Sequence, residues 1–243
     1  MSHTLRNCLV ALVIAAASQV SAFTFQPMFA LLDSSGQGSI QTFAVSNEGD
    51  ERLAVRFSVL SRTLGSDGQE INADAGDLFT IYPERVVVEP RSSAAVKLQW
   101  KGPAGVESER PFRLIAENVA LDSAVSATSG IKVMFRYVAS IYVGEAAFTP
   151  DLVCTVKGAT GSAGKKGLIV EIVNQGKKHV VADSTLLTIK GLKGGAVALG
   201  PKDLGPLSDA NYLPGNPVRL FIQRSDAVPG KSYDARLDYE AEY

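Results

Sequence analysis

Few residues of this sequence are suited to catalysis. Outside residues 1–22 it has one histidine, His179, and one cysteine, Cys154. Two such residues far apart in sequence cannot supply a zinc site made of histidine and cysteine ligands. A Ser-His-Asp triad would have to use His179, which we expect in a polar turn beside Lys177 and Lys178. We therefore expect no enzyme activity, and neither a metal nor a cofactor.

Two further patterns look like ligand-binding motifs but lack essential parts. Gly158, Gly161 and Gly164 have the spacing of a glycine-rich phosphate loop, yet no helix is expected after them to hold a phosphate. A flexible hairpin loop is the simpler interpretation. Residues 65–77 contain several acidic residues, which could suggest a calcium site. The segment lacks the spacing of an EF-hand, with its central glycine and closing glutamate. The acidic residues are Asp67, Glu70, Asp74 and Asp77, and we expect them in a solvated polar loop.

Two cations, Lys132 and Arg136, share one face of a predicted strand over residues 131–143. Strict alternation indicates a strand, because successive side chains point to opposite faces of a sheet. The other face is apolar throughout: Ile131, Val133, Phe135, Tyr137, Ala139, Ile141 and Val143. We predict that Lys132 and the edge leading into this strand bind another protein chain. A core strand with two solvated cations is the alternative that the pattern leaves open.

Residues 1–22 have the pattern of a cleavable secretion signal. Arg6 is the positive charge, residues 8–17 form a short apolar core, and residues 20–22 are a small-residue cleavage site. No later segment approaches the roughly 20 apolar residues that a membrane span needs. The net charge of −1 gives no electrostatic reason to expect nucleic acid or an anionic membrane as a partner. We expect a mature chain that begins at Phe23, lies outside the cytoplasm and buries Cys154 as an unpaired thiol.

Short alternating segments separated by turn residues fill the rest of the chain, without a helical period. Residues 53–59 and 96–100 are examples in the first half, and 168–173 and 233–243 in the second. The pattern predicts an all-β fold of two immunoglobulin-like β-sandwiches. Residues 144–150 break the pattern as a linker would. We therefore expect an N-terminal domain over residues 23–145 and a C-terminal domain over residues 146–243.

Several local motifs, in their order and spacing, resemble those of the PapD-like periplasmic chaperones that assemble fimbriae by the chaperone–usher route. They are a strand–proline–strand stretch over 79–90, Glu-Arg-Pro-Phe-Arg-Leu over 109–114, Ile-Lys-Val-Met-Phe-Arg over 131–136, Val-Ser-Asn over 45–47 and Tyr-Leu-Pro-Gly over 212–215. Residues 101–104 look more like the alternate subfamilies than the P-pilus chaperone. The resemblance covers the whole mature chain and implies two sandwiches in an L or boomerang arrangement.

The resemblance also implies a function and a site. Such chaperones are periplasmic, bind fimbrial subunits by donor-strand complementation and deliver them to an outer-membrane usher. Here Lys132 would anchor the terminal carboxylate of the subunit, and Glu109 and Arg136 would form an ion pair near the domain cleft. The donor side chains would be Leu121, Val125, Ala127, Ile131 and Val133.

This sequence departs from the family in two places. Phe29 stands where the family usually has an arginine in its first strand, and no arginine occurs between Arg6 and Arg52. We therefore expect anchoring by one residue, or a different anchor. The donor stretch 121–129 is poor in large apolar residues, and an ordinary loop remains its alternative interpretation.

Two further expectations concern the partners and the function. The free form can cap its exposed strand edge by self-association. The alternative function is a secreted two-domain adhesion or structural module, which would appear at the cell surface instead of remaining in the periplasm.

Overall fold

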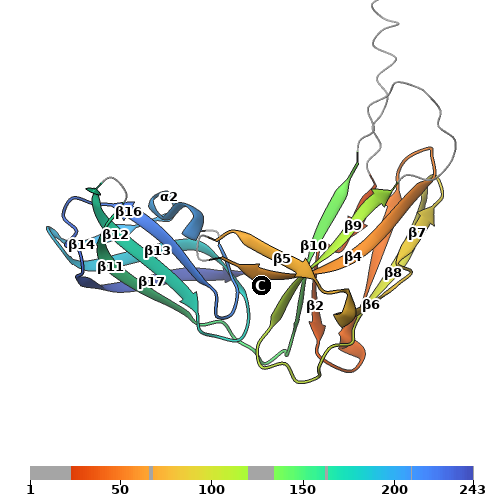
Figure 1. The fold of residues 1–243 in the computed structure, drawn as a ribbon, viewed down its shortest axis with the longest axis horizontal. Coiled ribbons are helices and arrows are strands. Elements are labelled where there is room, and N and C mark those ends of the chain that lie inside the picture. Colours follow the sequence, from red (N-terminus) through yellow and green to blue (C-terminus); the bar gives the residue numbers. More distant parts are fainter. Residues whose placement is uncertain (1–22, 66–67, 120–133, 162–163, 209, 243) are drawn as a thin grey trace, which may run out of the picture.

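Two β-sandwiches meet at an angle and give the molecule the shape of a boomerang (Figure 1). The structure is a computed structural model that describes residues 23–65, 68–119, 134–161, 164–208 and 210–242. The predicted all-β fold with two immunoglobulin-like sandwiches is confirmed. The helices with printed bounds are α2 (Pro201–Leu204) and the 3₁₀ turns at Gln37–Ser39, Gly76–Leu78 and Gly205–Leu207, and Gly164 also has 3₁₀ conformation. None of these helices has the length and apolar character needed to cross a membrane.

The first sandwich consists of two sheets. One has the strand order β1 (Thr24–Gln26), β3 (Ile40–Asn47), β8 (Ser92–Trp100) and β6 (Phe79–Tyr82). The other has the order β2 (Phe29–Asp33), β10 (Arg136–Gly144), β9 (Arg110–Val119), β4 (Leu53–Leu64) and β5 (Glu70–Asp74), with β7 (Arg85–Val88) also paired to β4. The chain changes sheets at Pro27 and Pro83, because proline has no N–H to continue a ladder. The expected strand boundary at Pro83 is confirmed.

The core of the first sandwich explains the alternation in β10. Ala139, Ile141 and Val143 are fully buried between the sheets, and Phe135 and Tyr137 pack against the same cluster. These described positions follow the predicted apolar face. The opposite face of the sheet β2-β10-β9-β4-β5 turns toward the second sandwich, and we refer to it as the concave face.

The second sandwich follows residues 145–151. Its strands are β11 (Leu152–Thr160), β12 (Lys166–Asn174), β13 (Val180–Leu192), β14 (Gly195–Leu199), β15 (Asn211–Tyr212), β16 (Pro217–Gln223) and β17 (Ser232–Glu242). The buried residues of the first hydrophobic core lie within residues 23–143, and those of the second core lie within residues 156–233. The segment between these ranges contains residues 145 and 146, where we propose that the domains divide.

One predicted loop is wrong in part. Residues 70–74 form strand β5, which pairs with the end of β4, for example Arg62 with Asn72. Glu70 is held by Arg62 of the adjacent strand β4 and by Arg113 of β9, and is not a freely solvated loop residue. The acidic composition suggested a loop because Arg113 is distant from Glu70 in sequence, and Arg62 meets Glu70 only through the pairing of β4 with β5.

Candidate functional site

The first half of β10 is an open sheet edge. Strand β2 pairs with β10 only from Ser140 to Gly144, and the Ser140 N–H donates to the Met28 carbonyl at 2.9 Å. Main-chain groups alternate in direction along a strand, so those of Arg136 and Val138 point to the same side as those of Ser140. Within the described residues no strand pairs with Arg136 or Val138 on that side. Among the residues that the structure describes, the backbone donors and acceptors of this edge have no strand partner, and an added strand can satisfy them.

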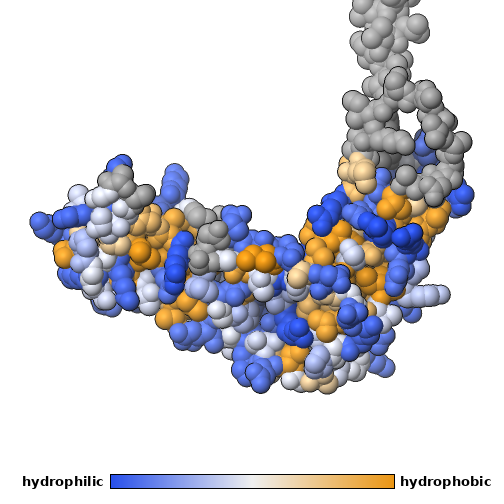
Figure 2. All heavy atoms as spheres, viewed as in Figure 1, coloured by the Kyte–Doolittle hydropathy of each residue, from blue (hydrophilic) through white to orange (hydrophobic). Residues whose placement is uncertain are grey.

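The concave face beside this edge is built in rows across the sheet. We call the angle between the sandwiches the elbow. The row of Ser140 and Arg113 lies closer to the elbow than the next row, which is apolar and consists of Val138 and Ile115. The next row is charged, with Arg136 opposite Glu117, and Glu117 binds Arg56. Val138 is 38% exposed and Met134 71% exposed. Figure 2 shows hydrophobic surface among charged residues on the side of the first sandwich that faces the opening.

A cluster of three ionised groups occupies the concave face between the open edge and the elbow. The Arg113 guanidinium binds Glu70 through two nitrogens, with Nε–Oε1 at 2.9 Å and Nη2–Oε2 at 2.5 Å. Arg62 Nε donates to the same carboxylate at 2.7 Å. The Arg113 hydrogen bond and the nearby Arg62 charge outweigh burial and lower the pKa of Glu70 to about 2. Glu70 is therefore ionised, and two cations share one anion.

The elbow is fixed by contacts between residues of the two sandwiches. His179 donates its backbone N–H to Glu109 Oε2 at 2.8 Å, and its Nδ1 lies 2.7 Å from Glu109 Oε1. The hydroxyl of Tyr142 accepts from Arg62 Nη1 at 3.1 Å and from Asn211 Nδ2 at 2.6 Å. His179 lies in the turn segment between β12 and β13, as expected, but it is 2% exposed and therefore buried, not at a solvated surface. Its burial depends on residues of the first sandwich that are distant in sequence.

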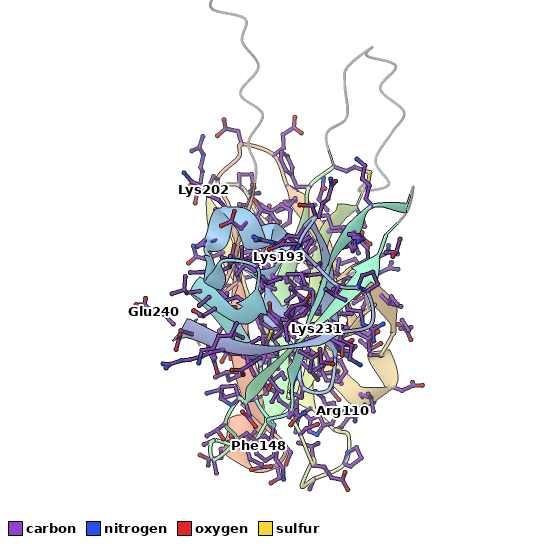
Figure 3. The ribbon with its side chains drawn as sticks, turned by 90° about the vertical axis from the view of Figure 1, so that its left-hand side faces the viewer. Arg110, Phe148, Lys193, Lys202, Lys231 and Glu240 are labelled. Carbon is purple, nitrogen blue, oxygen red and sulfur yellow. The ribbon has the colours of Figure 1, made fainter. Side chains whose placement is uncertain are left out.

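Arg110 and Phe148 lie near this elbow, below the second sandwich in the view of Figure 3. Arg110 packs over the Trp100 ring, with its Cζ atom 5.2 Å from the ring centroid, and Lys177 packs over Phe148 at 5.6 Å. The labelled charged residues of the second sandwich in the same view are Lys193, Lys202, Lys231 and Glu240. The Lys177–Phe148 contact adds local support where the chain passes between the sandwiches, and the Arg110–Trp100 contact lies within the first sandwich.

The predicted ion pair between Glu109 and Arg136 is wrong. The register of β9 and β10 places Arg136 opposite Glu117, whereas Arg110 lies opposite Val143. Glu117 follows Glu109 by eight residues, which is roughly 26 Å along an extended strand. Glu109 instead binds His179, and Arg136 lies at the far end of the sheet from the elbow. The motifs were matched by their order, which does not determine strand register.

The other predicted site residues have different outcomes. Lys132 and the donor positions Leu121, Val125, Ala127, Ile131 and Val133 lie outside the described residues. Phe29 lies on β2 directly beside Ser140 of β10, and its ring is 5.6 Å from Tyr142 and 5.9 Å from His179. The first-strand position is therefore aromatic and belongs to the elbow.

Four residues of the site were missed from the sequence: Arg62, Arg113, Tyr142 and the buried His179. Tyr142 had a usable signal, since it is an aromatic residue on the polar face of an alternating strand. Such a position suggests that something covers that face. Arg113 and His179 carried no comparable signal, because their partners lie on other strands of the fold.

Comparison with known proteins shows what this fold is similar to. No known protein family and no curated protein matches the sequence. The class 5 fimbriae chaperone CfaA is 13% identical with a TM-score of 0.59, and the match covers 89% of this chain and 98% of that chain. The YadV chaperone is 13% identical with a TM-score of 0.53, over 90% and 92% of the two chains.

A chain of the Salmonella enterica complex of SafA pilin with the SafB chaperone is 12% identical with a TM-score of 0.52, over 90% and 98% of the two chains. The described chain thus has the two-sandwich fold of fimbrial chaperones. At these identities the likeness concerns the fold.

Proposed function

We propose that this protein is a periplasmic chaperone that binds fimbrial subunits and delivers them to an outer-membrane usher. The observation that carries the proposal is the open edge of β10 at Arg136 and Val138, next to an apolar row on the concave face. The shared fold with fimbrial chaperones supports the same role. One of those neighbours comes from a complex of a chaperone with a pilin.

The binding mode in this proposal is donor-strand complementation. A subunit that lacks one strand of its sandwich exposes its own sheet edge, and two open edges satisfy each other through main-chain hydrogen bonds. The segment that precedes β10 would fill the subunit groove with alternate side chains, which are Leu121, Val125, Ala127, Ile131 and Val133. Lys132 would hold a subunit carboxylate as a point charge. Binding of this kind needs no catalytic step, and we propose none.

The proposal is tested by purifying the tagged protein from the periplasm of its host and identifying copurified proteins by mass spectrometry. The variant Val138→Pro removes an N–H that points to the open edge and leaves the ladder to β9 intact. We expect an incomplete immunoglobulin-like subunit with the wild type, and a loss of about tenfold or more with Val138→Pro. Ala139→Pro is the matched control, since its N–H points to β9 and its loss should unfold the sandwich.

Two results would contradict the proposal. One is equal retention of the subunit by the wild type and by a folded Val138→Pro variant. The other is the absence of any subunit together with accumulation of the protein at the cell surface, which would favour an adhesion module.

A further inference from the structure

We infer that two copies of this protein associate through strand β5, whose outer edges pair with each other in antiparallel orientation. The inference does not rest on the proposed function, and it concerns a different edge from that of β10. Strand β5 ends the sheet β2-β10-β9-β4-β5 on the side opposite β2. Among the described residues β4 is the only strand paired with β5, so the outer edge of β5 has no strand partner there.

The hydrogen bonds of the β4–β5 hairpin determine which backbone groups of β5 face outward. The Gly65 N–H donates to the Gln69 carbonyl at 2.8 Å, and the Ala75 N–H donates to the Val59 carbonyl at 3.0 Å. Because backbone groups alternate in direction along a strand, every second residue between Gln69 and Ala75 also faces β4. The residues whose N–H and C=O groups face the outer edge are Glu70, Asn72 and Asp74.

An antiparallel pair of β5 strands centred on Asn72 is self-complementary. The N–H and C=O of Asn72 then bond those of the same residue in the second copy, and Glu70 of each copy lies opposite Asp74 of the other. This arrangement has a two-fold axis, which gives a closed dimer and not a growing fibre. It also gives hydrogen-bond partners to the edge that a single copy leaves open to association.

The apolar side chains of β5 suit this register. Asn72 is paired with Arg62, which lies on the concave face, so Ile71 and Ala73 are on the opposite face of the sheet. Ile71 is 58% exposed and Ala73 is also exposed. In the dimer Ile71 of each copy lies opposite Ala73 of the other, and such cross-strand apolar pairs stabilise a sheet.

Charge favours the same register on the concave face. Asp74 of one copy and Glu70 of the other would repel each other if both were unpaired. Glu70 is bound by Arg62 and by Arg113, so these three groups together carry one net positive charge. The exposed Asp74 of the second copy is therefore attracted to this end of β5. Added salt should weaken the attraction.

A contact with the second sandwich holds the hairpin in place. The Leu64 N–H, at the end of β4, donates to Asn216 Oδ1 at 3.2 Å. Because the tip of the hairpin is attached at this point, β5 loses little freedom when it pairs with a second copy.

Sedimentation equilibrium of the mature protein, without any subunit, tests the inference. At protein concentrations of about 1–500 µM we expect a monomer–dimer equilibrium with a dissociation constant on the order of 100 µM, because the interface is small. Asn72→Pro removes an outward N–H and leaves the ladder to β4 intact. This variant should weaken dimerisation at least about tenfold.

Two further variants complete the test. Val138→Pro is the matched control, since it changes the open edge of β10 in the same way and should leave the dissociation constant unchanged. Ile71→Lys replaces an exposed side chain, so it remains informative if Asn72→Pro does not fold. A charge at this position of the edge should also weaken dimerisation about tenfold.

Three results would overturn the inference. The first is a monomer over the whole concentration range, and the second is a dimer that folded Asn72→Pro and Ile71→Lys variants leave unchanged. The third is a dimer that Val138→Pro abolishes, which would place self-association at the edge of β10. Because no subunit is present, none of these results bears on subunit binding, and failure of subunit binding would leave the dimer unaffected.

Discussion

Tyr142 and His179, from different sandwiches, stack face to face with their ring centroids 3.7 Å apart and their planes 5° apart. Both are 2% exposed, and His179 is also bound to Glu109, which precedes β9. The stack and the hydrogen bonds therefore form one buried joint between the sandwiches. Because a chaperone of the proposed kind must present β10 in an open angle, this joint positions the binding edge relative to the second sandwich.

Removal of Glu109 should loosen the joint. Glu109→Ala leaves the backbone N–H and Nδ1 of His179 without their buried partner, and we expect unfolding to become easier by about 1–3 kcal/mol. Urea denaturation measures this change, and small-angle X-ray scattering measures the spread of interdomain angles. Glu107→Ala is the control because Glu107 is exposed two residues away. Equal stability and scattering for both variants would contradict the role of Glu109.

The ion cluster predicts a dependence of stability on pH. The pKa of Glu70 is about 2 in the folded protein and 4.5 ordinarily, so its ionised form stabilises the fold above about pH 4.5. That contribution is lost as the pH falls from 4.5 through 2. The difference in unfolding free energy between wild type and Glu70→Gln should be constant near neutral pH and shrink across this window.

Urea denaturation at a series of pH values checks the Glu70 prediction. Glu89→Gln is the control, because Glu89 forms an exposed ion pair with Arg52 that is worth about 0–1 kcal/mol. A difference for Glu70→Gln that stays the same down to pH 2 would show that Glu70 is not stabilised as an ion.

Cys154 should react slowly in the native protein. Burial raises the pKa of its thiol to about 11 from an ordinary 9.0, which reduces the reactive thiolate roughly 100-fold at neutral pH. Alkylation by iodoacetamide, followed by mass spectrometry, should be that much slower in buffer than in urea. A cysteine at an exposed position, Ser232→Cys in a Cys154→Ser background, is the control. Equal native rates at the two positions would contradict this prediction.

The fold could be predicted from local patterns because the cores of both sandwiches depend on alternation. The apolar face of β10 at Ala139, Ile141 and Val143 follows directly from a period of two residues. Pro83 was likewise informative, since a missing N–H limits where a strand can continue. Such features depend on neighbours in sequence, and the structure confirmed them.

The site depended on contacts that no local pattern encodes. Glu109 was matched to Arg136 by motif order. In the structure Arg136 lies opposite Glu117 in the β9–β10 ladder, and Glu109 binds His179. His179 lies in the turn between β12 and β13 that its lysine neighbours suggested, but those neighbours gave no sign that it is buried. Its burial comes from Tyr142 and Glu109 of the other sandwich, which only the folded arrangement brings together.

Amide hydrogen exchange of β10, measured by NMR on the free protein and on its complex with the copurified subunit, tests the central claim most directly. The account predicts that the amides of Arg136 and Val138 exchange rapidly in the free protein and become protected in the complex. The amides of Tyr137 and Ala139, which point to β9, should be protected in both. A stable complex in which Arg136 and Val138 still exchange at the free rate would contradict pairing at this edge.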